Sequence, residues 1–331
     1  MKTQSTKFQQ GFTLIELLVA MAITTVIVTI LVSITSLALE TFNRNRVEVS
    51  AARQGEAMVD TIANDLESLV IRSGNNFEWL YAKSNPPSDG PNGTTSPNSL
   101  DLVFFSSVTD RYNGEIGESD DQGGDVSTLV YQLAYEDPIS DDEKFKSFIL
   151  YRKLINPDKT FGSGTSSGTL GTVYTTPSSD DLFQAAEDAD SDPSITGNEI
   201  SNAANFICEN IYQFTITFHV DVQIPSSGSD GSFTTRSIQI PITSDNYDQD
   251  PFKITGNGII SETIPAGLSG ETDSEEILQS GNLTAVEVSL SVLSDFGIEQ
   301  MRNRNMSGTE LNEFVAKNSY QYSKLVLVPG G

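Results

Sequence analysis

Residues 11–39 read GFTLIELLVAMAITTVIVTILVSITSLAL, and this stretch determines how the rest of the chain is organised. A polar, lysine-bearing leader precedes it, and between Phe12 and Leu39 the only charged residue is Glu16. A helix from Phe12 to Leu39 would be about 42 Å long at ~1.5 Å per residue, which exceeds a hydrocarbon core of ~30 Å. The stretch therefore predicts a membrane-spanning helix. Because a carboxylate inside such a span is costly, Glu16 indicates a partner or a purpose.

The apolar run is too long for a cleaved secretory signal, which has about 7–15 apolar residues and a cleavage site at their far end. Here the plausible cleavage mark, Gly11, lies before the run. Residues 11–20, GFTLIELLVA, closely resemble the processing signature of type IV prepilins and type II secretion pseudopilins. The resemblance implies that a membrane aspartyl peptidase, the prepilin peptidase, cuts between Gly11 and Phe12 on the cytoplasmic side. It also implies that this peptidase methylates the new amine of Phe12.

Processing at Gly11 would leave the hydrophobic helix on the chain, so the protein would stay in the membrane as a reservoir of subunits. Glu16 could then neutralise the amine of Phe12 in a neighbouring subunit when helices pack side by side. Two unpaired charges are costly in apolar surroundings and a paired set costs much less, so this contact would set the register of assembly. The alternative, in which Glu16 only reaches to the nearby membrane interface, stays open.

Beyond Leu39 the sequence predicts an amphipathic continuation of the same helix. Arg44 and Glu48 lie on a charged face, and Gly74 is a plausible helix stop. The apolar residues recur at spacings of three, four and seven, as on one helical face: Phe42, Val49, Ala52, Val59, Ile62, Leu66 and Leu69. The predicted organisation is a cleaved leader (1–11), a transmembrane helix (12–39), an amphipathic stalk helix (40–74) and a β-rich head domain (75–331).

The head is expected to be mainly antiparallel β-structure, which makes the fold class α+β with the long helix packed on the sheet. Strand-like runs occur at 100–106, 127–135, 147–155, 212–222, 233–242, 285–293 and 320–328. Long, often acidic loops are expected at 107–125, 157–181, 225–232 and 244–281. The runs DTIANDL (60–66), LVYQL (129–133), ILYRKL (149–154) and AVEVSL (285–290) look like minor pseudopilin J and minor pilins with a W-type head.

The chain is strongly acidic, with 45 Asp and Glu against 19 Lys and Arg and a net charge of −26. Such a surface repels nucleic acid and anionic lipid headgroups. Cys208 is the only cysteine and His219 the only histidine, which excludes an internal disulfide and any multi-cysteine or multi-histidine metal site. We predict a buried structural thiol for Cys208 and a strand position for His219. No serine-hydrolase elbow, phosphate loop or dinucleotide fingerprint is present.

One acidic run matches the spacing of oxygen ligands in a calcium-binding loop, with Asp188, Asp190, Asp192, Ser194 and Glu199 in the ligand positions. Pro193 stands where such a loop needs a glycine with positive φ, which proline cannot adopt. A solvated acidic loop is the competing interpretation. Calcium is thus the one cofactor that the sequence suggests, and none is required.

These features and the resemblance predict a minor pilin or pseudopilin, a structural subunit of a type II secretion pseudopilus or pilus-like filament, and not an enzyme. It would be a single-pass protein of the inner membrane, with its N-terminus cytoplasmic before processing and its head periplasmic or extracellular. The implied partners are prepilin peptidase, other pilins or pseudopilins, and an inner-membrane assembly platform with a cytoplasmic ATPase. Two alternatives remain open: an adhesive or DNA-uptake pilin, and a membrane-anchored extracytoplasmic carbohydrate-active enzyme that uses paired carboxylates.

Overall fold

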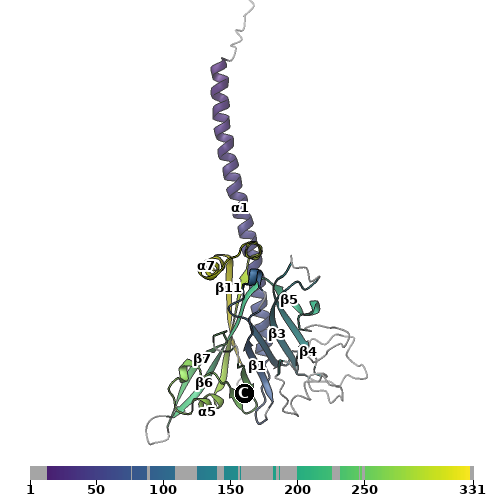
Figure 1. Ribbon diagram of the computed structural model, residues 1–331, viewed down its shortest axis with the longest axis vertical. Helices are drawn as coiled ribbons and strands as arrows, with labels where there is room; N and C mark the ends of the chain where they lie inside the picture. The colour runs from purple at the N-terminus through teal and green to yellow at the C-terminus, as the bar shows by residue number, and fades with distance from the viewer. Residues whose placement is uncertain are drawn as a thin grey trace, which may run out of the picture. The chain divides into compact units, whose positions relative to one another are not determined.

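The computed structural model (Figure 1) describes residues 13–75, 77–87, 90–108, 125–139, 145–155, 157, 182–183, 186, 200–225, 232–245, 247 and 250–328. The chain divides into two compact units, residues 1–50 and residues 51–331. The first contains the N-terminal part of helix α1, and the second contains its C-terminal part and the β-rich head. The expected α+β class, a long apolar N-terminal helix followed by antiparallel sheets, is confirmed.

Helix α1 spans Leu14–Glu67 without interruption. It ends before Gly74, the stop suggested by the sequence, because the next residues pair with strand β2 instead of continuing the helix. Leu69 forms an antiparallel bridge with Ser106, and the amide of Val70 donates to the carbonyl of Phe105 over 2.8 Å. Gly74 does adopt a left-handed conformation, with φ of 80°, in the turn that leads to the head.

Seven strands form the first sheet, in the order β5-β4-β3-β2-β1-β8-β9, and every neighbouring pair is antiparallel. Their bounds are β1 Glu78–Ser84, β2 Leu100–Ser106, β3 Ser127–Glu136, β4 Ser147–Ile155, β5 Phe206–Glu209, β8 Phe252–Thr255 and β9 Gly258–Ile260. The second sheet has the antiparallel order β11-β10-β6-β7. Its strands are β6 Ile211–Pro225, β7 Phe233–Pro241, β10 Asn282–Leu293 and β11 Ser319–Leu327. All seven strand-like runs identified in the sequence are strands.

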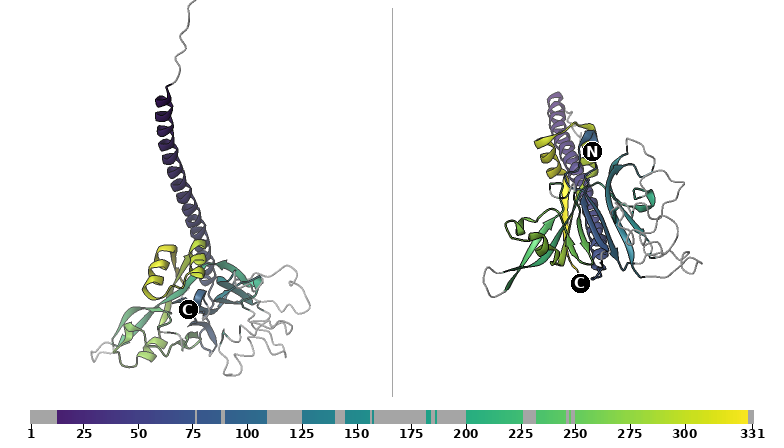
Figure 2. Two further views of the ribbon diagram at one scale, coloured as in Figure 1. Left: turned by 45° about the horizontal axis from the view of Figure 1, so that its top comes forward. Right: turned by 60° about the horizontal axis from the view of Figure 1, so that its bottom comes forward.

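The main core lies between the C-terminal part of α1 and the inner faces of both sheets (Figure 2). The helix contributes the apolar face predicted from its spacing, including Val59, Ile62 and Leu66. Strand β6 shows which face of the second sheet is buried, because buried and partly exposed residues alternate along most of its length. This alternation directs one face towards the helix and leaves the other more open.

The first sheet is buried on both faces. Trp79, Tyr81, Val103 and Phe105 belong to a second apolar cluster, on the face away from α1, together with Leu182 and other residues of the chain between β4 and β5. Double burial accounts for the continuous apolar run in β2, all seven residues of which are buried.

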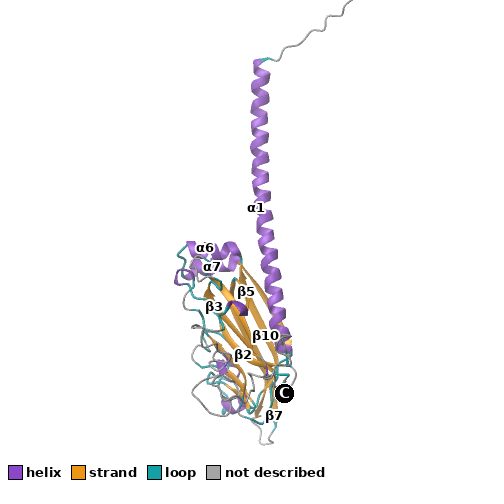
Figure 3. Ribbon diagram, turned by 90° about the vertical axis from the view of Figure 1, so that its right-hand side faces the viewer, coloured by secondary structure: helices purple, strands orange, loops and turns teal. Residues whose placement is uncertain are grey.

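The segment 244–281, expected to be a loop, instead contains β8, β9, the short helix η3 (Ala266–Leu268) and helix α5 (Ser274–Gln279). That expectation was wrong because the strands are too short to show a period, and burial of Phe252, Ile254 and Ile259 is what holds them on the sheet. Two further helices, α6 (Asp295–Asn303) and α7 (Gly308–Asn318), lie side by side at one end of the head (Figure 3). The remaining short helices are η1 (Pro91–Gly93) and η2 (Ala203–Asn205).

Candidate functional site

The start of α1 forms a capping box between Thr13 and Glu16. The backbone amide and the hydroxyl of Thr13 both donate to Oε2 of Glu16, each over 2.9 Å. In return the amide of Glu16 donates to the hydroxyl of Thr13 over 3.4 Å. This reciprocal arrangement satisfies helix N-terminal amides and places a negative charge at the positive end of the helix. Among the described residues, Oε1 of Glu16 accepts no hydrogen bond, so this oxygen is available to another donor.

The two residues at the expected processing site, Gly11 and Phe12, lie outside the described residues. Their roles in cleavage and assembly therefore stay predictions, as does the pairing of Phe12 with Glu16. The capping box shows only that the carboxylate of Glu16 is held at the helix start, next to where the new amine would form.

The apolar part of α1 has the surface and the hydrogen bonding of a membrane helix. Every large apolar side chain from Leu14 to Phe42 is more than half exposed. The hydroxyls of Thr25, Thr29 and Ser33 donate back to carbonyls one turn earlier, over 2.8, 2.8 and 3.0 Å. Polar groups satisfied within the helix suit apolar surroundings. In the described part of the chain, α1 is the one helix whose length and composition allow it to cross a membrane.

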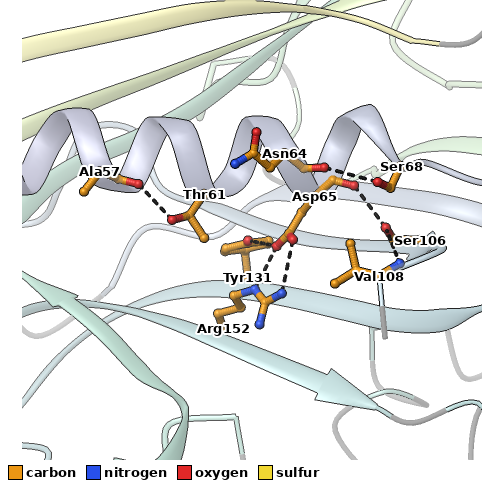
Figure 4. Close-up of polar contacts among 9 residues, drawn as sticks. All are labelled: Ala57, Thr61, Asn64, Asp65, Ser68, Ser106, Val108, Tyr131 and Arg152. Atoms are coloured by element: carbon orange, nitrogen blue, oxygen red, sulfur yellow. Dashed lines mark hydrogen bonds and ion pairs between the residues drawn. The ribbon is translucent and has the colours of Figure 1, made fainter. Parts of the chain in front are cut away.

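Deep in the head, Asp65 of α1 binds two residues of the first sheet (Figure 4). Its carboxylate lies 2.7 and 3.1 Å from Nε and Nη2 of Arg152 on β4, and it also accepts the hydroxyl of Tyr131 on β3. The Asp65 carbonyl accepts the hydroxyl of Ser106 over 3.1 Å. The charged side chains are only 6% and 14% exposed for Asp65 and Arg152. This cluster joins the helix to the sheet by charge-assisted bonds inside the core.

Burial and charge within this cluster fix the protonation states of its members. Burial is the main reason that the pKa of Tyr131 is raised well above its usual value, and the negative charge of Asp65 raises it further. Burial is the largest single influence on Arg152 and would lower its pKa, but the hydrogen bonds and charges of Asp65 and Tyr131 together outweigh burial and the net direction is upward. The tyrosine therefore stays neutral and the arginine charged at physiological pH. The sequence runs that contain these residues do not reveal that they touch. Asp65, between Ile62 and Leu66 on an apolar helix face, does indicate a buried polar contact.

The single cysteine and the single histidine occupy the predicted environments. Cys208 is buried on β5, and this burial, reinforced by nearby Glu209, raises the pKa of its thiol to about 12. His219 lies on β6, with Nε2 3.9 Å from Oε2 of Glu287 on the neighbouring strand β10. Both fit structural roles.

Because the nucleophile is the thiolate, the raised pKa of Cys208 predicts an inert thiol. We expect the folded protein to react with an aromatic disulfide reagent at pH 8 at least about tenfold more slowly than the urea-unfolded chain. The rate should rise only as the pH approaches 12. The absorbance of the aromatic thiolate released by the reagent measures the reaction rate of Cys208 directly, since the chain has one cysteine. A folded protein that reacts as fast as the unfolded one would contradict the buried assignment.

The candidate calcium ligands Asp188, Asp190, Asp192, Ser194 and Glu199 all lie outside the described residues. Within the described part of the chain, no group of three or more His, Cys, Asp or Glu side chains is arranged to hold a metal ion. The calcium loop therefore stays a prediction from the sequence.

Comparison with known families gives one match. The model of the prokaryotic N-terminal methylation motif matches residues 6–32, a range that includes Gly11, Phe12, the capping box and much of the apolar helix. This match supports a type IV pilin-like or pseudopilin subunit, processed by prepilin peptidase and assembled with other pilins. Comparisons with curated proteins and with solved structures found no match. The likeness of the head to pseudopilin J or to W-type minor pilins therefore has no support beyond the sequence patterns.

Proposed function

We propose that this protein is a minor pilin or pseudopilin, a structural subunit of a type II secretion pseudopilus or a related pilus-like filament. The observation that carries the proposal is the methylation motif at residues 6–32, together with the exposed apolar part of α1 up to Leu39, whose one charged side chain, Glu16, is held at the helix start. In this proposal the chain is not an enzyme and requires no cofactor.

Prepilin peptidase would cut after Gly11 and methylate Phe12, leaving α1 in the inner membrane and the head outside the cytoplasm. The apolar helix then keeps the subunit in the membrane until an assembly platform, driven by a cytoplasmic ATPase, extracts it into a filament. Removal of helices one by one from lipid is costly unless their apolar surfaces pack on other subunits. Sibling pilins supply that surface.

Glu16 would guide this packing. Its Oε2 accepts the two bonds from Thr13, while Oε1 accepts none from a described residue. Oε1 can therefore receive the methylated amine of Phe12 from an adjacent subunit without loss of the helix cap. Pairing two charges in apolar surroundings is far cheaper than burying either alone, so only helices in the correct register would pack stably.

Replacing Glu16 by alanine is expected to leave cleavage intact and to lower assembly by about tenfold or more, which corresponds to the loss of ~1.4 kcal/mol per contact. The measurement compares sheared filament and membrane fractions in cells that contain the other filament components. The matched control is Glu48→Ala, which removes an exposed acid from the same helix outside the apolar run. Wild-type amounts of filament-associated Glu16→Ala protein would contradict the charge-pairing step.

Calcium binding by residues 188–199 is a separate proposal that the filament role does not need. If the loop binds calcium, millimolar calcium should raise the Tm of the full chain, and Asp190→Asn or Asp192→Asn should remove that rise. Asp250→Asn, in a different acidic run, serves as the control. An unchanged Tm of the wild-type chain would rule the loop out as a calcium site.

A further inference from the structure

A groove on the head, with a volume of about 640 Å³, is lined by segments that are far apart in the sequence. They are the turn after β3, the start of β4, strand β5 and helix α6. Three of the lining side chains are apolar and unusually exposed: Ile139 is 90% exposed, Phe145 66% and Phe206 39%. Exposed apolar side chains gathered in one place, on a chain with a net charge of −26, mark a site of association.

One wall of this groove, formed by α6 and the start of β4, is held by hydrogen bonds before any partner arrives. Ser294 caps the start of α6, accepting the amide of Gly297 over 3.1 Å, and Asn92 donates to the carbonyl of Met301 at its end over 2.8 Å. The buried side chain of Asn210 joins α6 to β4, because it donates to Asp295 over 2.8 Å and accepts from Ser147 over 2.7 Å. A wall that is already held in place loses little conformational entropy when a partner binds.

The charge of the lining is negative. Among the described lining residues, Asp137, Glu209 and Asp295 contribute carboxylates and Arg302 is the cation, which donates to the backbone carbonyl of Lys146. Glu209 is exposed, and its carboxylate accepts no hydrogen bond from a described residue. A cationic group that enters between the apolar side chains would therefore meet complementary charge.

We propose that this groove binds a segment of a different protein in which apolar side chains alternate with lysine or arginine. A second copy of this chain is a poor occupant, because each copy carries a net charge of −26 and two copies repel each other. The proposal goes beyond the filament role, since it concerns a surface of the head and not the N-terminal helix.

The test measures binding of an octapeptide of alternating lysine and leucine to the full chain in phosphatidylcholine nanodiscs, with empty nanodiscs as the blank. The groove variants are Phe145→Ser, Ile139→Ser and Glu209→Lys. Their matched controls are Phe233→Ser, at a phenylalanine that is 63% exposed on β7, and Glu313→Lys, at an exposed acid on α7. An alternating glutamate and leucine octapeptide tests the sign of the charge. Equal Tm values establish that the variants are folded.

We expect the lysine peptide to bind the wild-type chain and both controls with Kd values within about twofold, and each groove variant about tenfold or more weakly. The glutamate peptide should not bind. Equal binding to groove and control variants would show diffuse attraction to an acidic protein and would overturn the proposal. Absence of lysine-peptide binding, or equal binding of the glutamate peptide, would also overturn it. Because the assay involves neither cleavage nor filaments, its failure would leave the proposed filament role intact.

Discussion

Gly11→Val is expected to abolish conversion of the full-length chain to the shortened, methylated form. A peptidase must bring its catalytic groups close to the peptide bond after residue 11, and only glycine leaves that backbone without a Cβ. Valine adds a branched side chain at this point and also stiffens the backbone. Gly11→Ala, which adds a single methyl group, should slow processing less severely than valine.

The measurement is the fraction of processed chain in cells that produce prepilin peptidase, read as a mobility shift and verified by N-terminal sequencing. Gln9→Val is the control, since it introduces the same side chain two residues before Gly11. A Gly11→Val chain that still begins at Phe12 would show that the peptidase does not read this position.

Asp65→Ala is expected to destabilise the head by about 3–5 kcal/mol, because it leaves the guanidinium of Arg152 buried without its counter-charge. For a domain of this size the Tm should fall by roughly 6–20 °C. Replacing both partners, as Asp65→Leu with Arg152→Leu, should recover part of the loss, since two apolar side chains leave no uncompensated charge.

The chain offers a matched control on the same helix. Asp60 pairs with Lys324 on β11 over 2.9 Å, but these side chains are 64% and 38% exposed. Asp60→Ala should therefore cost less than ~1 kcal/mol. Thermal unfolding of the two variants, followed by circular dichroism, separates the effects. Equal Tm values for Asp65→Ala and Asp60→Ala would contradict the role assigned to the buried cluster.

Much of the fold could be predicted from local sequence patterns. The long helix follows from an apolar run that passes into a helically spaced stripe, and strand β6 follows from its alternation of apolar and polar residues. Strands β8 and β9 could not be recognised, because four and three residues carry no period and their pairing depends on distant segments.

The sequence also conceals contacts between distant segments. Gly55 lies inside a helix with no local reason for glycine, yet a Cβ there would come within 2.2 Å of the ring of Tyr322 on β11. Asp65 and Arg152 are 87 residues apart, so no spacing rule links them. By contrast, the capping box at Thr13 and Glu16 has a local signature, a threonine followed three residues later by glutamate, although only the charge of Glu16 was interpreted from the sequence.

Intact-mass analysis of the membrane-extracted protein would establish whether this chain is a processed pilin-like subunit. The protein would be produced in parallel with and without prepilin peptidase. We expect a peptidase-dependent loss of residues 1–11 together with the mass of one added methyl group on Phe12. A full-length, unmethylated chain in both preparations would contradict it and would reduce the N-terminal segment to an ordinary membrane anchor.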